Sequence, residues 1–381
     1  MPRSSALRFY QFSAAHALLI GLLPFYLPAL LWQAGQSLAD IAVFIAIGGF
    51  SYAACLLAWD ALRARHAFPV LVVPSFVLWL AVVAATVFDP EFATTPLTAA
   101  LYGAYGCFYW MTQRLLFVEC TGPDNTGRRF GNAQILVTVL LKVGILCGGF
   151  LWDRAGAGSV LTVAVVLGLV TTVASLRLSW PTHTRVPASR PRDLVGFSDR
   201  HRSRAVFLVD GVFLFAESFF WVITLYALAD QNIANLGVLV VVLSAVLSVV
   251  FYLIKNRLDT APPHRIYVLA VLGYAASWGL RGAVDLAGGA TWSYVVIVLI
   301  AFLTALFRLV FNKRFFDLAR LEQPHAYIVA KSQWSQLALG VGYLACALTV
   351  FGGLSPTWAL PLFYALLVPL TGVYLRYRAA L

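Results

Sequence analysis

Residues 205–229 read AVFLVDGVFLFAESFFWVITLYALA, and this stretch decides how the rest of the chain must be arranged. Its length suits a helix that crosses a bilayer, which takes about 20 apolar residues. The stretch nevertheless contains two carboxylates, Asp210 and Glu217, whose spacing of seven residues places them on one face of a helix. A charge at mid-bilayer depth costs roughly 2.5–3.5 kcal/mol, so it is rarely left facing lipid. We therefore expect this helix to border a polar pathway that other helices enclose.

The composition is that of a polytopic membrane protein. Of 381 residues, 61% are hydrophobic and 11% are charged, whereas soluble domains contain about 25% charged residues. A net charge of +11 would suggest a nucleic-acid partner for a soluble chain, but here the basic residues lie in short loops between apolar segments. We therefore expect membrane lipid, and no nucleic acid, around the chain. The five cysteines lie in or beside apolar segments without a CxxC spacing, so we predict no disulfide framework, metal site or cofactor.

The hydropathy pattern predicts an all-α protein with twelve membrane-spanning helices. A polar stretch at 179–204, rich in Pro, Ser, Thr and Arg, divides the spans into an N-terminal six-helix bundle (1–178) and a C-terminal six-helix bundle (205–381). We interpret this stretch as a cytoplasmic linker and expect a monomer. The predicted spans are residues 10–32, 37–59, 68–88, 97–119, 130–151, 157–178, 205–229, 234–254, 266–284, 291–312, 327–351 and 357–376.

The loop charges predict the orientation of these spans. With the N-terminus inside, 21 basic residues fall on the inner side, and the outer loops hold only Arg154 and Arg281. Short cytoplasmic loops carry such an excess of Lys and Arg. No glycosylation sequon or lipidation motif is present. The pattern therefore predicts a multi-pass protein of a bacterial cytoplasmic (inner) membrane with both termini in the cytoplasm.

Two degraded motifs accompany this layout. After the second span, Asp60 and Arg65 stand where Gly-x-x-x-Asp-Arg/Lys-x-Gly-Arg-Arg/Lys has its acid and a late basic residue, although both glycines are missing. In the fifth span, Gly144, Gly148 and Gly149 match part of Gly-x-x-x-Gly-Pro-x-x-Gly-Gly. Together with the six-plus-six layout, these residues resemble the major facilitator superfamily. The resemblance implies alternating access around a central cavity lined by the first, fourth, seventh and tenth spans.

Two carboxylates and a histidine are candidate proton carriers. Glu217 lies thirteen residues after Arg204, near the predicted membrane centre, where it either carries a proton or only hydrogen-bonds neighbouring helices. Asp210 lies nearer the cytoplasmic mouth, where a gate salt bridge or a helix-end role is the simpler interpretation. His16, in the first span, is of a type that titrates near neutral pH, but a packing histidine is an equal alternative.

Lys142 is a candidate for binding the substrate, because it lies near mid-depth of the fifth span, where a lone amine needs a partner. Two partners remain open: Glu217 in the opposite bundle, or a negatively charged substrate.

Aromatic and amide side chains extend this candidate pocket. Tyr105, Tyr109 and Gln113 share one stripe of the fourth span, and Trp221 shares the stripe of Glu217. Such side chains suit a pocket that holds an organic solute by stacking and hydrogen bonds, and they equally suit helix packing.

Two arginines end corresponding spans in similar motifs, Arg114-Leu-Leu-Phe117 and Arg308-Leu-Val-Phe311. In the family that the chain resembles, these helices meet at the inner gate, so Arg114 and Arg308 either latch that gate or snorkel to the membrane surface. Pro24 and Pro28 predict a bend in the outer half of the first span.

The sequence thus favours a secondary transporter of a small organic solute, coupled to protons through Glu217, and not an enzyme. No Walker motif is present, so ATP is not expected to drive it. Two alternatives remain: a membrane-embedded enzyme acting on lipid-like substrates, and a receptor or scaffold of the same fold that transports nothing.

Overall fold

The structure, a computed structural model, describes residues 3–88, 96–120, 126–177, 180, 186–260, 263–284 and 291–377. For residues 3–6, 120, 126–134, 248–260, 263 and 291 it describes the backbone alone. Every element in these ranges is a helix, as predicted. In chain order they are α1 (Arg3–Leu22), η1 (Pro24–Tyr26), α2 (Leu27–Gln33), α3 (Leu38–Arg65), α4 (Pro69–Phe88), α5 (Pro96–Cys120), α6 (Thr126–Arg177), α7 (Pro191–Val195), α8 (Ser203–Phe215), η4 (Ala216–Phe220), α9 (Trp221–Leu228), α10 (Ile233–Thr260), α11 (Pro263–Gly282), α12 (Thr291–Leu321), α13 (Pro324–Thr349), α14 (Pro356–Leu370) and η5 (Thr371–Arg376).

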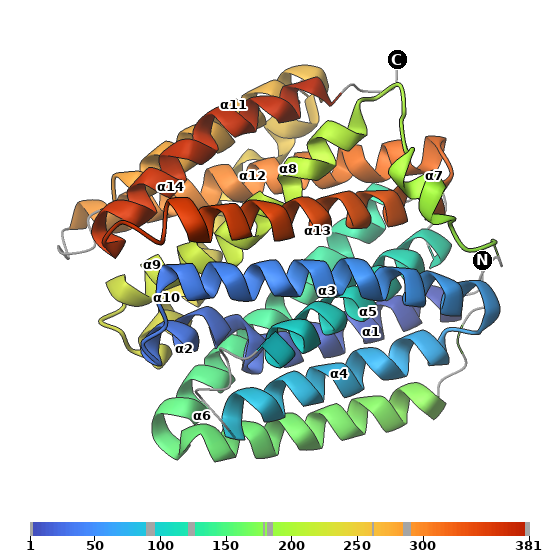
Figure 1. The fold of residues 1–381 in the computed structure, drawn as a ribbon, viewed down its shortest axis with the longest axis horizontal. Helices are drawn as coiled ribbons and strands as arrows, with labels where there is room; N and C mark the ends of the chain where they lie inside the picture. The colour runs from blue at the N-terminus through green and yellow to red at the C-terminus, as the bar shows by residue number, and fades with distance from the viewer. Residues whose placement is uncertain are drawn as a thin grey trace.

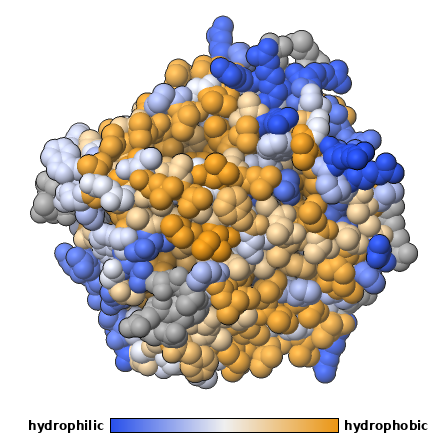
Figure 2. Space-filling model, viewed as in Figure 1, coloured by the Kyte–Doolittle hydropathy of each residue, from blue (hydrophilic) through white to orange (hydrophobic). Residues whose placement is uncertain are grey.

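The helices lie side by side along one direction (Figure 1). Helices α1 to α6 form the lower part of that view, α11 to α14 form the upper part, and α3 packs along α13 between them. Both ends of the chain lie at the same end of the helices as α7. We call this end of the molecule the linker end. Figure 2 shows a face that is mostly hydrophobic in its middle, with hydrophilic residues gathered near its edges.

Six helices of the described chain are long and apolar enough to cross a membrane by themselves, and a bent pair near the N-terminus raises the number to seven. Within the described residues, each of the twelve predicted spans falls largely on helix, but the described parts of the remaining helices do not pass the same test of length and hydropathy. The fold is therefore that of a multi-pass helical membrane protein, and the count of twelve spans stays a prediction.

Proline and glycine set the two sharpest turns in the N-terminal half. The first predicted span bends by 47° between α1 and the helices η1 and α2, which begin at Pro24 and at the residue before Pro28. This confirms the predicted proline bend. The fifth and sixth predicted spans are continuous in α6 except for a kink at Gly156, whose φ of 75° breaks the helix. Only a residue without Cβ adopts that conformation at little cost.

The glycines of the fifth span let α6 approach α1 closely. A Cβ added at Gly144 would lie 2.2 Å from the carbonyl oxygen of Leu18, and one at Gly148 would lie 2.1 Å from that of Leu22. Close backbone contact through small residues is how membrane helices gain packing energy. Two of the three matches to the fifth-span glycine motif, Gly144 and Gly148, thus serve the contact between α1 and α6.

Gly148→Ala is therefore expected to destabilise the protein by about 1–3 kcal/mol, the usual cost of overpacking. The matched control is Gly158→Ala in the same helix, because a Cβ at Gly158 would have open space around it. Thermal unfolding of the purified variants would measure the difference. Equal unfolding midpoints for the two variants would show that the contact between α1 and α6 is looser than the structure has it.

Candidate functional site

Glu217 lies on an unusual turn of helix. The seventh predicted span consists of α8, the π-helix η4 and α9, so the α-helical hydrogen-bond pattern is interrupted at Ala216–Phe220. Single π-turns within α-helices are frequent at functional sites. The Glu217 side chain is 16% exposed, and the next residue, Ser218, is exposed. The carboxylate is therefore held within the protein but keeps some access from outside.

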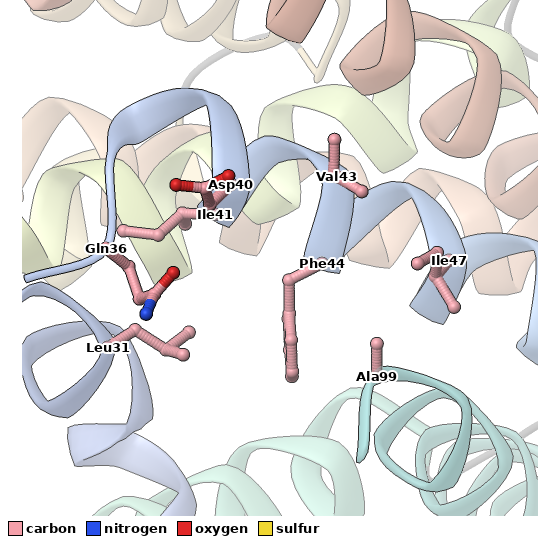
Figure 3. Close-up of a pocket in the computed structure, with 8 residues that line it drawn as sticks. All are labelled: Leu31, Gln36, Asp40, Ile41, Val43, Phe44, Ile47 and Ala99. Atoms are coloured by element: carbon pink, nitrogen blue, oxygen red, sulfur yellow. The ribbon is translucent and has the colours of Figure 1, made fainter. Parts of the chain in front are cut away.

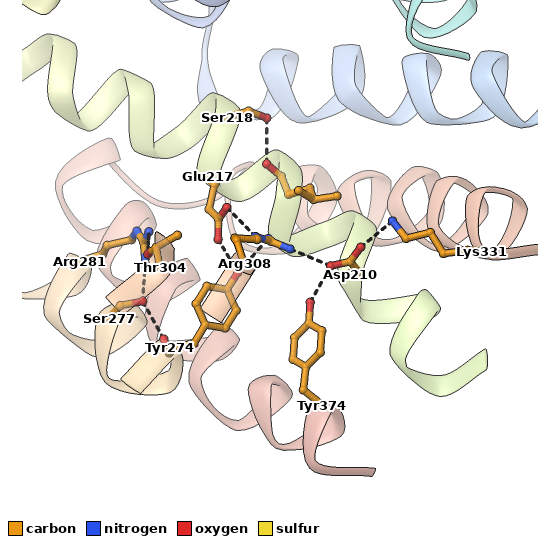
Figure 4. A network of polar contacts seen from close by, with 11 residues as sticks. Asp210, Glu217, Ser218, Tyr274, Ser277, Arg281, Thr304, Arg308, Lys331 and Tyr374 are labelled. Atoms are coloured by element: carbon orange, nitrogen blue, oxygen red, sulfur yellow. Dashed lines mark hydrogen bonds and ion pairs between the residues drawn. The ribbon is translucent and has the colours of Figure 1, made fainter. Parts of the chain in front are cut away.

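Arg308 of α12 binds both carboxylates of this span (Figure 4). Its Nε donates to Glu217 Oε2 at 3.1 Å, and one terminal nitrogen donates to Asp210 Oδ1 at 2.8 Å. The other terminal nitrogen donates to the hydroxyl of Tyr274 at 3.1 Å. A planar guanidinium suits this role, because its N–H groups point in fixed directions toward several acceptors. Arg308 thus links α12 to both acids, Asp210 in α8 and Glu217 in η4.

Further donors complete the cluster. Lys331 of α13 lies 2.7 Å from Asp210 Oδ2, and the Tyr374 hydroxyl donates to Asp210 Oδ1 at 3.1 Å. The Tyr274 hydroxyl donates to Glu217 Oε1 at 2.5 Å. We call Asp210, Glu217, Arg308 and Lys331 the charge cluster. It pairs two acids with two bases, and Asp210 is its most deeply buried member at 1% exposure. Buried charges persist only when they are paired and hydrogen-bonded in this way.

These contacts decide between two interpretations of Arg308. Snorkelling is wrong for this residue, because its guanidinium turns inward to two carboxylates and is only 16% exposed. The sequence placed Arg308 at the end of its span, but α12 continues to Leu321, so the residue lies in the middle of a helix. For Asp210, the contacts likewise favour the salt-bridge interpretation over a helix-end role.

Arg281 was predicted to lie in an outer loop, and this is wrong. It lies in α11 and is buried, with its terminal nitrogens donating to Ser277 at 2.9 Å and to Thr304 at 2.9 Å. Its Cζ lies 4.2 Å from the ring centre of Trp278 and 5.1 Å from that of Trp221. Trp221 is itself buried here, so it packs against a cation in the described structure.

Lys142 does not pair with Glu217, whose two oxygens are taken by Arg308 and Tyr274. Lys142 is half-buried in α6 and forms no ion pair with any described side chain. Of its two predicted partners, only the substrate therefore remains open.

The other N-terminal candidates lie together among aromatic rings. His16 is fully buried, its Nε2 lies 3.0 Å from the hydroxyl of Ser75, and its ring stacks on Phe76 at 4.2 Å. Tyr109 packs against His16 at 4.3 Å and accepts a long hydrogen bond of 3.3 Å from Gln113. Tyr105 is buried beside them. The structure brings these residues together but not to the charge cluster, and their proposed roles stay predictions.

Toward the linker end, α5 of the N-terminal half contacts the C-terminal half. Arg114 donates to the hydroxyl of Ser332 at 2.7 Å. Further along, the rings of Phe117 and Phe316 lie 4.7 Å apart. His325 Nε2 also lies 3.4 Å from Glu119. Contacts that join the two halves at one end are what a gate requires, so the geometry is compatible with the predicted latch at Arg114.

Asp60 binds the linker and a neighbouring arginine. Its Oδ1 accepts from Arg63 Nε at 2.7 Å, and its Oδ2 accepts from the backbone N–H of Ser189 at 2.7 Å. Arg63 in turn donates to the carbonyl of Pro187 at 3.3 Å. Arg65 is exposed and takes no part in these bonds. Thus the buried acid of α3 holds residues 187–189 in place.

Asp60→Asn is expected to release this part of the linker, because a neutral amide loses the ion pair with Arg63 and accepts more weakly from Ser189. Trypsin should then cleave after Arg192, an exposed residue of the same segment, about 5- to 30-fold faster, the factor that 1–2 kcal/mol of local stability represents. Arg65→Gln removes a charge from the same helix end and should leave cleavage after Arg192 unchanged. Equal rates in both variants would contradict the anchoring role of Asp60.

Two cavities in the described structure lie away from the charge cluster. One, of about 80 Å³, is lined by the end of α2 and the start of α3, including Gln36, Asp40 and Phe44 (Figure 3). It is too small for an organic solute, since such pockets measure about 300–1,000 Å³. The other, of about 700 Å³, lies between the linker and the start of α13 and includes Arg63, Glu322 and His325. Its size would admit a solute at the linker end.

Several residues of the site were not among those predicted from the sequence. Lys331 and Arg281 carried a usable signal, because a charge within or beside an apolar span needs a partner. Tyr274 and Tyr374 carried none, since tyrosines are common in such spans and their hydroxyl partners depend on tertiary packing. Among the described residues, no group of three or more His, Cys, Asp or Glu side chains could hold a metal ion.

Comparison with known proteins gives the fold a precedent. No family model matches this chain, and no curated protein matches it in sequence. Two solved structures of the nucleoside transporter NupG, one of them of a point mutant, are similar over nearly the full length of both chains. The mutant structure has a TM-score of 0.69 at 12% identity, with coverage of 98% of this chain and 100% of NupG. The other has a TM-score of 0.65 at 12% identity, with coverage of 97% of each chain. The chain thus has the fold of a membrane transporter.

Proposed function

We propose that this protein is a secondary transporter of the major facilitator type, which moves a small organic solute across a bacterial inner membrane by alternating access. The observation that carries the proposal is Glu217, a partly exposed carboxylate on a π-turn, bound by Arg308 and Tyr274 within transmembrane helices. The similarity in fold to NupG supports the same class of function.

Glu217 is proposed to carry the coupling proton. When Glu217 takes up a proton, Arg308 loses one of its two anionic partners and keeps Asp210. The attraction that holds η4 to α12 then weakens, because an ion pair becomes a neutral hydrogen bond. Protonation thereby changes how firmly the π-turn is held.

The π-turn also contacts the N-terminal half, which gives the proton a route to the conformational change. The ring of Phe219, two residues after Glu217, lies 6.1 Å from Phe44 of α3 and 5.8 Å from Tyr102 of α5. A shift of η4 therefore alters a contact between the two halves. Coupling requires such an element, with two arrangements that both ligands bias.

Uptake into proteoliposomes tests this function. The purified protein would be reconstituted and offered labelled uridine, sugars, amino acids and organic acids, with and without an acidic exterior. Uridine is included because NupG is a nucleoside transporter. We expect at least one solute to accumulate, and only with the pH gradient. Transport of no solute, or accumulation that a protonophore leaves unchanged, would contradict the proposal.

A further inference from the structure

Among the residues that the structure describes, the interior holds more basic than acidic side chains. Asp210 and Glu217 neutralise Arg308 and Lys331 through ion pairs of 2.7–3.1 Å. Three more basic residues lie in the helices without an ion-pair partner among the described side chains: Arg114, Lys142 and Arg281. The acids at helix ends are already engaged, Asp40 with Ser37, Asp60 with Arg63 and Glu119 with His325. The described interior therefore has a surplus of positive charge.

Lys142 lies on a face of α6 that packs against α10 of the C-terminal half. It shares a face of α6 with Ile145 and Gly149, three and seven residues further on. A Cβ at Gly149 would lie 3.3 Å from Ala234 of α10, and the Ile145 carbonyl lies 3.4 Å from the Cβ position of Gly237. This face of α6 therefore meets the C-terminal half, and Lys142 lies on it, partly exposed.

Arg281 adds positive charge from the other half. It is 2% exposed, its two terminal nitrogens bind hydroxyl groups, and its Nε has no hydrogen-bond partner among the described residues. Thr304, which it binds, lies one helical turn from Arg308, and Trp221, under its guanidinium, lies one turn from Glu217. Arg281 therefore lies beside the charge cluster and forms no ion pair with its described acids (Figure 4).

We propose that the transported solute is an organic anion and that Lys142 binds its carboxylate or phosphate group. This inference rests on the proposed transport function. An unpaired charge is costly away from water, so surplus cations favour a ligand that supplies the missing negative charge. Proton uptake by Glu217 increases the surplus of positive charge by one. The anion therefore binds better to the protein with Glu217 protonated, and anion and proton are carried together.

Thermal unfolding of the full chain with matched ligand pairs tests the charge of the solute. The probes are benzoate and benzamide, succinate and succinamide, and uridine 5′-monophosphate and uridine, at constant ionic strength. A ligand that binds the folded form raises the unfolding midpoint. We expect at least one anion, but not its neutral partner, to stabilise the wild type. Equal stabilisation by both members of each pair, or by none of the anions, would overturn the proposal.

Variants of Lys142 test its role. Lys142→Gln should weaken binding of the stabilising anion about 10- to 100-fold, the effect of losing a hydrogen bond to a charged group. Lys142→Arg should retain most of the affinity. Lys313→Gln removes the same charge from an exposed position of α12 and should change nothing. Unchanged affinity in a folded Lys142→Gln variant would overturn the assignment to Lys142. The ligand pairs on the wild type decide the charge class even if that variant does not fold.

The outcomes separate this inference from the proposed function. A neutral solute that accumulates with the pH gradient would support proton-coupled transport and refute the proposal that the solute is an anion. An anion that accumulates equally without the gradient would support the proposal that the solute is an anion and refute proton coupling.

Discussion

Asp210→Asn is expected to destabilise the protein by about 3–5 kcal/mol, the usual cost of removing one partner from a buried ion pair. Asp210 is 1% exposed and is the shared counter-ion of Arg308 and Lys331. Its Oδ1 also accepts a hydrogen bond from the hydroxyl of Tyr374. Asparagine has nearly the same shape but no charge, so Lys331 loses its ion-pair partner and Arg308 keeps only Glu217. The loss should appear as a lower unfolding midpoint and a lower yield of folded protein.

A second substitution shows whether charge is the cause. Adding Lys331→Gln to Asp210→Asn removes the base that would otherwise stay unpaired, so the double variant should regain part of the lost stability. Groups in direct contact show such non-additive coupling, of about 0.5–3 kcal/mol. Asp317→Asn, at an exposed position of α12, is the matched control and should unfold like the wild type. A double variant less stable than Asp210→Asn would show that packing, and not charge balance, holds the cluster together.

The helical fold could be predicted from the sequence because its causes are local. Hydropathy marks each apolar segment, and the proline bend after α1 follows from residues at Pro24 and Pro28. The break at Gly156 depends on one residue whose φ other side chains avoid. None of these features requires knowledge of which helices touch.

The charge cluster could be predicted only in part, because its pairing depends on tertiary packing. The cost of a buried carboxylate identified Glu217 and Asp210. Their main partner, Arg308, comes from a helix 91 residues further along, as measured from Glu217. The end of its helix was placed too early, so snorkelling to the membrane surface stood as an equal alternative to a gate latch. When a helix boundary is uncertain by one turn, an arginine that faces inward can be interpreted as one that snorkels to the surface.

Arg281 shows the opposite error from the same cause. A basic residue close to the end of a predicted span looks like a loop residue, yet its guanidinium reaches inward to Thr304 and two tryptophan rings. The hydropathy of a segment does not show how deep in the membrane the charged end of a long side chain lies, because that end can lie far from its own helix axis. The sequence therefore indicated how many charges need partners, while the structure was needed to say which charges remain unpaired.

Glu217→Gln is expected to abolish accumulation driven by the pH gradient while leaving solute exchange across the membrane intact. Glutamine keeps an oxygen that can accept from Arg308 Nε, so the contact between η4 and α12 survives, but the side chain no longer binds a proton. One proton moved down a gradient of one pH unit supplies about 1.4 kcal/mol, which supports about tenfold accumulation. The wild type should reach that ratio in proteoliposomes, whereas the variant should stop at equal concentrations inside and outside.

Counterflow of labelled solute against an unlabelled internal pool measures the exchange that should survive, because it needs no net proton movement. Asp317→Asn, at an exposed position of α12, is the matched control and should accumulate solute like the wild type. If the Glu217 variant still accumulates solute under the gradient, the proton is carried elsewhere, and the buried His16 becomes the next residue to substitute. If counterflow is lost together with accumulation, Glu217 holds the structure or the solute and is not the proton carrier.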